Sequence, residues 1–212
     1  MNPCVYAVRD GRGLIQVRED RQHTVRTLHF GNHIEQSRYY LNAPFTLGFE
    51  YFEVAFRRLT ALVPASLLSL GLGGGRLNTQ LFYTLPQCRQ TIVELRPAVT
   101  QVARDWFDLP EKLNIVHEDA FHYMTLQGDR HDALFVDLFD DKGMPVQFAS
   151  DVFIDALLDA LNPGGRALIN LWRDDPTVRY VLLPWLRRRN DLELTLHPMR
   201  SSPNWIAEIH LK

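Results

Sequence analysis

The chain has 212 residues, 46% of them hydrophobic, which is enough for one substantial core with a small appendage and too little for two full-sized domains. A formal net charge of -2 supplies no uniform positive field, so nucleic acid is a poor candidate partner. Two cysteines, Cys4 and Cys88, are too few for a disulfide framework, and no run approaches the about 18 apolar residues of a membrane span. We therefore expect a cytoplasmic protein that binds neither nucleic acid nor membrane.

The N-terminal segment alternates apolar and polar positions in short pieces separated by glycines. The alternation is clearest in residues 14–18 and 25–30 and predicts a small antiparallel sheet within residues 1–44. After Pro44, apolar side chains recur every three to four residues and predict a linker helix within residues 45–63.

From Pro64 onward, short β-rich runs alternate with helical stretches. Strands are expected at 67–70, 92–94, 113–117, 133–137 and 166–171, and helices at 78–82, 97–106, 120–126 and 150–161. Residues 162–165, Asn-Pro-Gly-Gly, should end the last helix and turn the chain into its next strand, and 192–197 with 205–211 should form a terminal hairpin. Such alternation predicts an α/β fold in residues 64–212, with a Rossmann-like, doubly wound parallel sheet of the S-adenosylmethionine-dependent methyltransferase type.

A glycine turn follows the first strand of this domain and includes Gly71, Gly73 and Gly75. Glycines let the backbone approach a ligand closely, although an ordinary tight turn is an equally good explanation for the glycines alone. Glu94 ends the next strand, where a carboxylate can accept hydrogen bonds from both ribose hydroxyls, or can simply be a solvated charge. Asp119 follows the third strand and could accept a bond from an adenine amino group. Together these features favour adenosine binding.

Three carboxylates, those of Asp137, Asp140 and Asp141, follow the fourth strand at the same edge of the sheet. Carboxylates beside a cationic sulfonium are electrostatically favourable and would attract an amine substrate. They could instead hold Mg²⁺, but the sequence lacks a phosphate-cradling loop with its lysine, so we expect no metal.

In combination these segments resemble the polyamine aminopropyltransferases, the spermidine and spermine synthase family, across about residues 14 to 171. The segments that carry the resemblance are 26–31, Glu35-Gln36-Ser37, Tyr51-Phe52-Glu53, Gly71 to Gly75, Val93-Glu94, Glu118-Asp119-Ala120 and Asp137 to Pro145. The resemblance implies transfer of an aminopropyl group from decarboxylated S-adenosylmethionine to a small amine, with release of 5′-methylthioadenosine and no tightly bound cofactor. It also implies a homodimer that pairs through the N-terminal hairpins, whose exposed edge is a plausible pairing surface.

The resemblance assigns a role to each candidate residue. Asp137, directly or through water, would take a proton from the amine, because amines with a pKa near 10 are protonated at neutral pH. Glu94 would hold the ribose and Asp119 the adenine. Asp140 would bind the amine, and Tyr51 and Gln36 would orient it. We also count Gln36 among the residues of the nucleoside site.

Three departures from the family pattern keep other functions open. Gly74 stands where the family has an aspartate that grips the amino group of the donor, Phe52 replaces a histidine, and the chain is shorter than usual at both ends. Arg76 could pair with the carboxylate of intact S-adenosylmethionine, which favours an ordinary methyltransferase, whereas Ser69 replaces an acid common in methyltransferases. A non-catalytic adenosyl-binding or assembly protein is a third hypothesis. NAD chemistry is disfavoured because its fingerprint needs a glycine at the position of Arg76.

Overall fold

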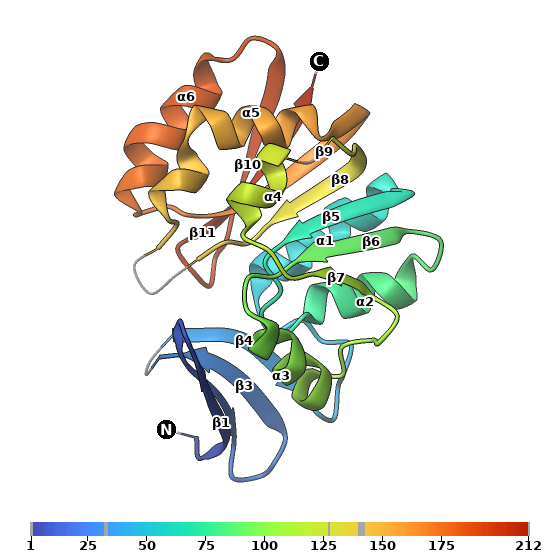
Figure 1. Cartoon of the computed structure of the whole chain (residues 1–212), viewed down its shortest axis with the longest axis vertical. Coiled ribbons are helices and arrows are strands. Elements are labelled where there is room, and N and C mark those ends of the chain that lie inside the picture. Colours follow the sequence, from blue (N-terminus) through green and yellow to red (C-terminus); the bar gives the residue numbers. More distant parts are fainter. Residues whose placement is uncertain (1, 32–33, 127, 140–142, 212) are drawn as a thin grey trace.

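The computed structural model describes residues 2–31, 34–126, 128–139 and 143–211. Its strands form an N-terminal four-stranded sheet and a larger seven-stranded sheet. The smaller sheet lies at one end of the molecule, next to the larger α/β unit (Figure 1). The two sheets therefore separate the β appendage from the α/β part of the chain, as the sequence patterns suggest.

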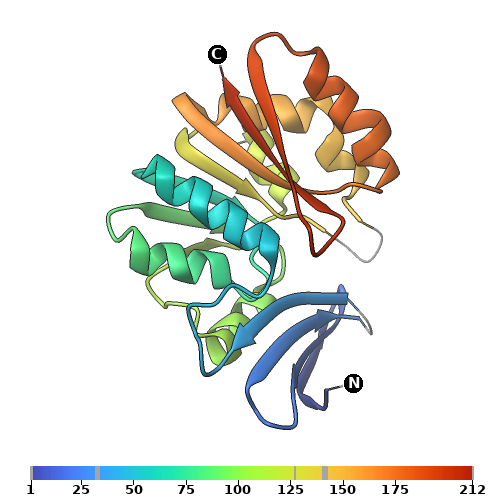
Figure 2. The ribbon, with the colours of Figure 1, turned by 180° about the vertical axis from the view of Figure 1, so that it is seen from behind.

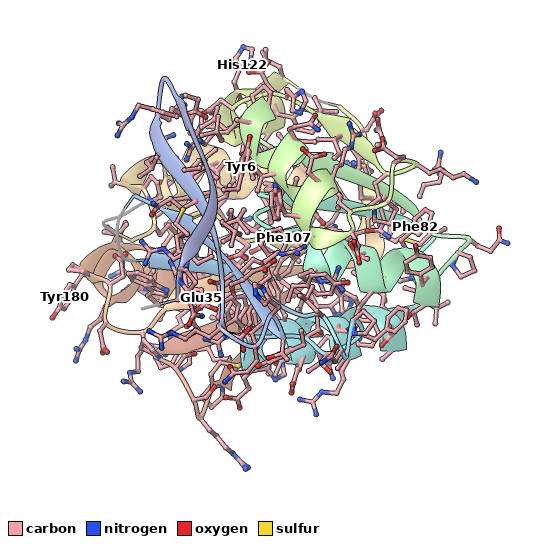
Figure 3. All side chains as sticks on the ribbon, turned by 90° about the horizontal axis from the view of Figure 1, so that it is seen from below. Tyr6, Glu35, Phe82, Phe107, His122 and Tyr180 are labelled. Carbon is pink, nitrogen blue, oxygen red and sulfur yellow. The ribbon has the colours of Figure 1, made fainter. Side chains whose placement is uncertain are left out.

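The N-terminal sheet consists of β1 (Cys4–Asp10), β2 (Gly13–Glu19), β3 (Val25–Phe30) and β4 (Ile34–Tyr40), all antiparallel and in chain order. Its alternating sequence places Ile15, Val17 and Leu28 on one face, where they pack against Phe107 of α3 (Pro97–Phe107). Figure 3 views the molecule from the side of this sheet and labels Phe107 next to its strands. The appendage thus buries an apolar face against the larger unit.

The larger sheet has the strand order β10-β11-β9-β8-β5-β6-β7. The first five strands in chain order are parallel to one another: β5 (Ser66–Leu70), β6 (Arg89–Val93), β7 (Asn114–Val116), β8 (His131–Val136) and β9 (Leu161–Trp172). The last two are β10 (Leu192–Pro198) and β11 (Asn204–Leu211). β11 runs antiparallel to both of its neighbours, β9 and β10. The remaining α-helices are α1 (Glu50–Leu62), α2 (Arg76–Thr84), α4 (Ala120–Leu126), α5 (Asp151–Asp159) and α6 (Leu183–Arg188). No helix in the described part of the chain has the length and apolar composition needed to cross a membrane.

Helices cover both faces of the larger sheet, so both faces of its central strands must be apolar. Neighbouring residues Leu67 and Leu68 of β5 point to opposite faces, and both are buried. α1 and α2 pack on the face of Leu67, which is toward the viewer in Figure 2, and α4 and α5 pack on the other face (Figure 1). Strands buried on both sides read as apolar runs without alternation, which is the pattern that predicted a parallel sheet.

The structure confirms the predicted fold class and the terminal β10–β11 hairpin, and differs from the prediction at residues 162–165. This Asn-Pro-Gly-Gly segment was expected to form a turn before the strand, but it lies inside β9. His131 and Ala133 of β8 pair with Leu161 and Arg166 of β9. Between these two pairs the chain advances two residues in β8 and five residues in β9. The additional residues form a wide bulge, which the positive φ of 78° at Gly164 accommodates.

A single arginine joins the N-terminal sheet to the start of α3. Arg96 donates two hydrogen bonds of 2.9 Å to the carboxylate of Asp10, at the β1–β2 turn, and one of 3.1 Å to the carbonyl of Gly13. Its guanidinium also lies 4.8 Å from the ring centre of Phe30. Because the arginine side chain is only 10% exposed, this bidentate pair is shielded from solvent screening.

We expect Arg96→Ala to lower the free energy of unfolding by about 1.5 to 3 kcal/mol, the usual worth of charge-assisted hydrogen bonds that leave an unpaired partner. Arg173→Ala is the control, since Arg173 pairs with Asp174 at the surface, where substitutions change stability by about 0.5 kcal/mol or less. Urea denaturation of both variants measures the difference. Equal stability of the two variants would contradict a structural role for the Arg96–Asp10 pair.

Candidate active site

The candidate site lies at the carboxyl ends of β5, β6 and β8, where parallel strands of an open α/β sheet bind ligands. The glycine loop follows β5, Glu94 follows β6 and Asp137 follows β8. β4 of the N-terminal sheet packs against the glycine loop from the other side, because Ser37 and the main chain of Gln36 contact it. The site therefore forms where the two sheets meet.

Gly71 and Gly74 of the glycine loop are packed too closely against their neighbours to carry a side chain. A Cβ atom on Gly71, which has a φ of 90°, would collide with the main-chain oxygen of Asp137. A Cβ atom on Gly74 would lie 2.5 Å from the hydroxyl oxygen of Ser37. A side chain at position 74 would therefore require Ser37 to move.

Glu94 is a buried carboxylate with two main-chain donors. Its Oε2 accepts a hydrogen bond of 3.1 Å from the amide of Leu72 in the glycine loop, and its Oε1 accepts one of 2.8 Å from the amide of Arg96. Burial raises the pKa of Glu94 above its ordinary value, against the opposing effect of these two bonds. A side chain that is 7% exposed is not a solvated strand-end charge, and each oxygen keeps a lone pair for a ligand hydroxyl.

Asp119 has a local role at the start of α4. Its Oδ1 accepts hydrogen bonds from the amides of Phe121 (2.9 Å) and His122 (3.1 Å), which is the arrangement of a helix N-cap. The cap uses only one carboxylate oxygen. Asp119 can therefore cap α4 and still present Oδ2 to an adenine amino group, as the sequence predicts.

Asp137 ends β8 beside the glycine loop. Its Oδ1 accepts a hydrogen bond of 2.8 Å from the side-chain amide of Asn170. Burial raises the pKa of Asp137 to about 6, and the bond from Asn170 only partly opposes this shift. A carboxylate that titrates close to neutral pH is suited to accept a proton from a substrate.

Tyr51, in the first turn of α1, is brought close to two carboxylates. Burial raises its pKa well above the ordinary value, and the negative charges of Asp137 and Glu35 add to the shift. Glu35 lies on β4 and pairs with Arg38 through hydrogen bonds of 2.8 and 2.9 Å. Glu35 belongs to the Glu35-Gln36-Ser37 segment that carries the resemblance, but the sequence alone predicts no role for it.

Arg76 is engaged in protein contacts, which argues against the predicted role in binding a ligand carboxylate. Its Nη1 donates a hydrogen bond of 2.6 Å to the carbonyl of Phe107, and its Nη2 donates to the carbonyl of Pro44. The guanidinium also lies 4.1 Å from the ring centre of Tyr39, and burial lowers its pKa. Arg76 is 3% exposed and joins the linker and α3 to the start of α2.

Two further sequence features are placed as follows. Phe52 is 7% exposed, and its ring centre lies 6.2 Å from the ring centre of Phe135. The aromatic residue at the family's histidine position therefore belongs to the core. Asp140 and Asp141, predicted to bind the amine or a rival metal ion, lie outside the described residues. The described end of this loop is held by Asp175, whose carboxylate accepts a hydrogen bond of 3.0 Å from the amide of Met144.

Curated proteins with the same pattern identify the relatives of the chain. It is 30% identical over 168 residues to polyamine aminopropyltransferases of Neisseria meningitidis, a match that covers 77% of this chain and 64% of the relatives. The chain is a divergent relative of the polyamine aminopropyltransferases. The match spans less than two thirds of the length of these aminopropyltransferases, and no family model matches the chain.

Methyltransferases are also among the similar proteins. The eEF1A lysine and N-terminal methyltransferase of Xenopus laevis is 30% identical over 131 residues, which cover 56% of this chain and 19% of that protein. Among solved structures, a probable spermidine synthase from Corynebacterium glutamicum superimposes with a TM-score of 0.77 at 20% identity, over 99% of this chain and 79% of that one. A spermidine synthase in complex with the transition-state analogue AdoDATO gives a TM-score of 0.73 at 17% identity, over 99% and 73%. These two solved structures show that the chain shares their fold.

We expect Asp137→Asn to stabilise the protein at alkaline pH. Because its folded pKa is raised from 3.8 to about 6, the Asp137 contribution to stability is full below pH 3.8 and is lost as the pH rises through about 6. The loss corresponds to about 3 kcal/mol, at about 1.4 kcal/mol for each pKa unit. Urea denaturation should show the variant more stable than the wild type at about pH 8, with the difference shrinking towards about pH 4. A difference that is independent of pH would contradict the raised pKa.

We expect Gly74→Ala to destabilise the protein by about 1 to 3 kcal/mol, because the added methyl group overpacks the contact with Ser37. Removing the opposing side chain in the double variant Gly74→Ala/Ser37→Gly should recover part of this loss, leaving the weaker contact with Phe107. A double-mutant cycle of thermal or urea unfolding measures the coupling. Purely additive effects would mean that the two residues do not pack as described.

Proposed function

We propose that the protein transfers an aminopropyl group from decarboxylated S-adenosylmethionine to a small amine. The observation that carries the proposal is Asp137, a partly buried carboxylate with a pKa of about 6 that lies beside the glycine loop and whose charge acts on Tyr51. Its position and proton affinity suit a group that accepts a proton from an attacking amine. The kinship with the polyamine aminopropyltransferases supports the same chemistry.

The reaction needs little covalent participation from the protein. The amine nitrogen attacks the aminopropyl carbon next to the sulfonium, the new C–N bond forms, and the C–S bond breaks with its electron pair moving to sulfur. The nucleoside leaves as neutral 5′-methylthioadenosine, and the proton of the amine passes to Asp137 directly or through water. Glu94 and Asp119 would hold the ribose and the adenine, and thereby place the sulfonium in line with the nitrogen.

Negative charge on the acceptor side favours a cationic substrate. Tyr51 lies within electrostatic range of both Asp137 and Glu35, so an amine bound beside the phenol would meet two carboxylates. Arg38 offsets part of the Glu35 charge through its bidentate pair. The same carboxylates also favour the protonated, unreactive amine, which is why a carboxylate that can itself take the proton is needed.

Methyl transfer is the second candidate, and one observation favours it. Gly74 has neither an acid nor the space for one, so the site lacks the carboxylate that would select a donor with a terminal amine. Intact S-adenosylmethionine, however, carries a carboxylate that would need a cation, and Arg76 is already engaged with two carbonyls and Tyr39. Because Arg76 is not free to pair with that carboxylate, aminopropyl transfer remains the function that we propose. The homodimer and the cytoplasmic location stay predictions.

The nucleoside product distinguishes the two reactions. With decarboxylated S-adenosylmethionine and a series of diamines we expect 5′-methylthioadenosine, whereas intact S-adenosylmethionine with an acceptor would yield S-adenosylhomocysteine if methyl transfer were the activity. Asp137→Asn should reduce turnover by about 10²- to 10⁴-fold, the usual range for loss of a general base. Glu94→Ala should abolish donor binding measured by calorimetry.

Glu111→Gln serves as the control, because this carboxylate is 78% exposed and belongs to a surface pair with Arg104. It should bind the donor and turn over like the wild type. Absence of binding by either sulfonium compound or by 5′-methylthioadenosine would overturn the adenosyl-site assignment altogether.

A further inference from the structure

Two buried asparagines connect the C-terminal hairpin to Asp137. Asn170 lies near the end of β9 and is 1% exposed, and Asn204 begins β11 and is 7% exposed. Asn204 donates a hydrogen bond of 2.9 Å from its amide nitrogen to the side-chain oxygen of Asn170. Asn170 in turn donates one of 2.8 Å to Oδ1 of Asp137. The three side chains form a continuous chain of hydrogen bonds from the hairpin to the site.

The direction of these bonds is set by chemistry. An ionised carboxylate only accepts hydrogen bonds, so Asn170 must turn its amide nitrogen to Asp137 and its oxygen away. That oxygen then requires a donor, and Asn204 supplies one. Without Asn204, Asn170 could rotate its amide group and present oxygen to the carboxylate, which would be repulsive.

The backbone around Asn204 is held firmly. The amide of Met199 donates a 3.0 Å bond to the carbonyl of Asn204, which closes the β10–β11 turn, and Asn204 pairs with Trp172 in the β9–β11 register. The amide of Arg173 also bonds to the carbonyl of Pro203 at 2.9 Å. Asn204 therefore approaches Asn170 from a fixed main-chain position.

The same turn is attached to the helix that carries Tyr51. Glu50, the residue before Tyr51, accepts three hydrogen bonds at Oε2: from the amides of Arg200 and Ser201 at 2.8 Å and from the hydroxyl of Ser201 at 2.7 Å. The β10–β11 turn thus contacts both sides of the candidate site, the Asp137 side through two asparagines and the Tyr51 side through a glutamate.

We propose that Asn170 and Asn204 are positioning residues that hold the Asp137 carboxylate with Oδ1 occupied and Oδ2 directed to the substrate, and that Glu50 anchors the same hairpin turn to the start of α1. The inference rests on the proposed function of Asp137. A buried carboxylate fixed at one oxygen has one orientation, so its reactive oxygen is in place before substrate binds.

The test compares Asn170→Leu and Asn204→Leu with a matched control on the same strand. Asn162, at the other end of β9, also donates a 2.8 Å side-chain bond to an aspartate, Asp132, so Asn162→Leu removes the same type of contact far from the site. Carboxyl-carbon NMR of the full chain follows the titration of Asp137, assigned with Asp137→Asn. Turnover and KM for the donor are then measured against pH.

We expect Asp137 to titrate at higher pH in Asn170→Leu and, by a smaller amount, in Asn204→Leu, because each change weakens the bond that favours the ionised form. The acidic limb of the kcat profile should move by the same amount, kcat should fall by about 10- to 100-fold, the usual effect of losing a group that orients a site residue, and KM for the donor should stay unchanged. Asn204→Ser, which keeps a hydroxyl donor and leaves the fold less perturbed, should fall between Asn204→Leu and the wild type.

Glu50 is tested separately. Glu50→Ala should lower kcat without moving the Asp137 titration, and Glu50→Gln, which keeps an acceptor oxygen, should retain most of the activity. An Asp137 titration that is unchanged in both leucine variants, or shifted equally by Asn162→Leu, would overturn the positioning role. If the wild type transfers no aminopropyl group, the proposed function fails, but the titrations still decide whether the asparagines control Asp137.

Discussion

The packing of the glycine loop between two elements is the constraint on which the rest of the site depends. Gly71 lies against the main chain of Asp137 at the end of β8, and Gly74 lies against Ser37 of β4. These contacts leave no room for a Cβ atom at either glycine, and the contact with Ser37 joins the loop to the N-terminal sheet. Glu94 then receives an amide from the loop itself, at Leu72, and its neighbour Arg96 reaches back to Asp10 of the N-terminal sheet. The glycine loop thus contacts or bonds to the candidate ribose-binding and proton-accepting residues and to the N-terminal sheet.

The same close packing removes charged groups from water, and the structure compensates them unequally. Arg76 donates hydrogen bonds to two main-chain carbonyls and lies over the ring of Tyr39. Glu94 accepts hydrogen bonds from two main-chain amides. Asp137 is held by one hydrogen bond from Asn170, and its pKa remains raised. An incompletely compensated carboxylate costs stability, and such costs are concentrated where a protein needs reactivity. Asp137 and Glu94 both keep a raised pKa, but Glu94 has two main-chain donors whereas the hydrogen bond from Asn170 is the one that lowers the pKa of Asp137.

The parts of the structure that could be predicted from sequence are those determined by local periodicity and strand order. The apolar runs around Leu67 and Leu134 predict a covered parallel sheet, and the topology of such a sheet then brings Glu94 and Asp137 to one edge. The role of Arg76 was not predictable, because its partners Pro44 and Phe107 lie 32 and 31 residues away and are main-chain atoms without a sequence signature. The asparagine chain was missed for the same reason, since Asn170 and Asn204 meet only after β11 pairs with β9. Residues 162–165 misled because a turn sequence can also form a bulge within a strand.

Aminopropyl and methyl transfer differ less in chemistry than in which carbon next to the sulfonium faces the nucleophile. Both reactions need a held nucleoside, a desolvated sulfonium and an acceptor that has lost a proton. In the aminopropyltransferase pattern an acid on the glycine loop grips the amino group of the donor; position 74 is a glycine here, and Arg76 is held by main-chain carbonyls. In the proposed reaction, selection would then come from the acceptor side, where the charges of Asp137 and Glu35 both act on Tyr51. A cationic amine bound there by two carboxylates would itself repel a cationic donor arm pointing the same way, so the bound acceptor and the fixed nucleoside together decide which carbon is attacked.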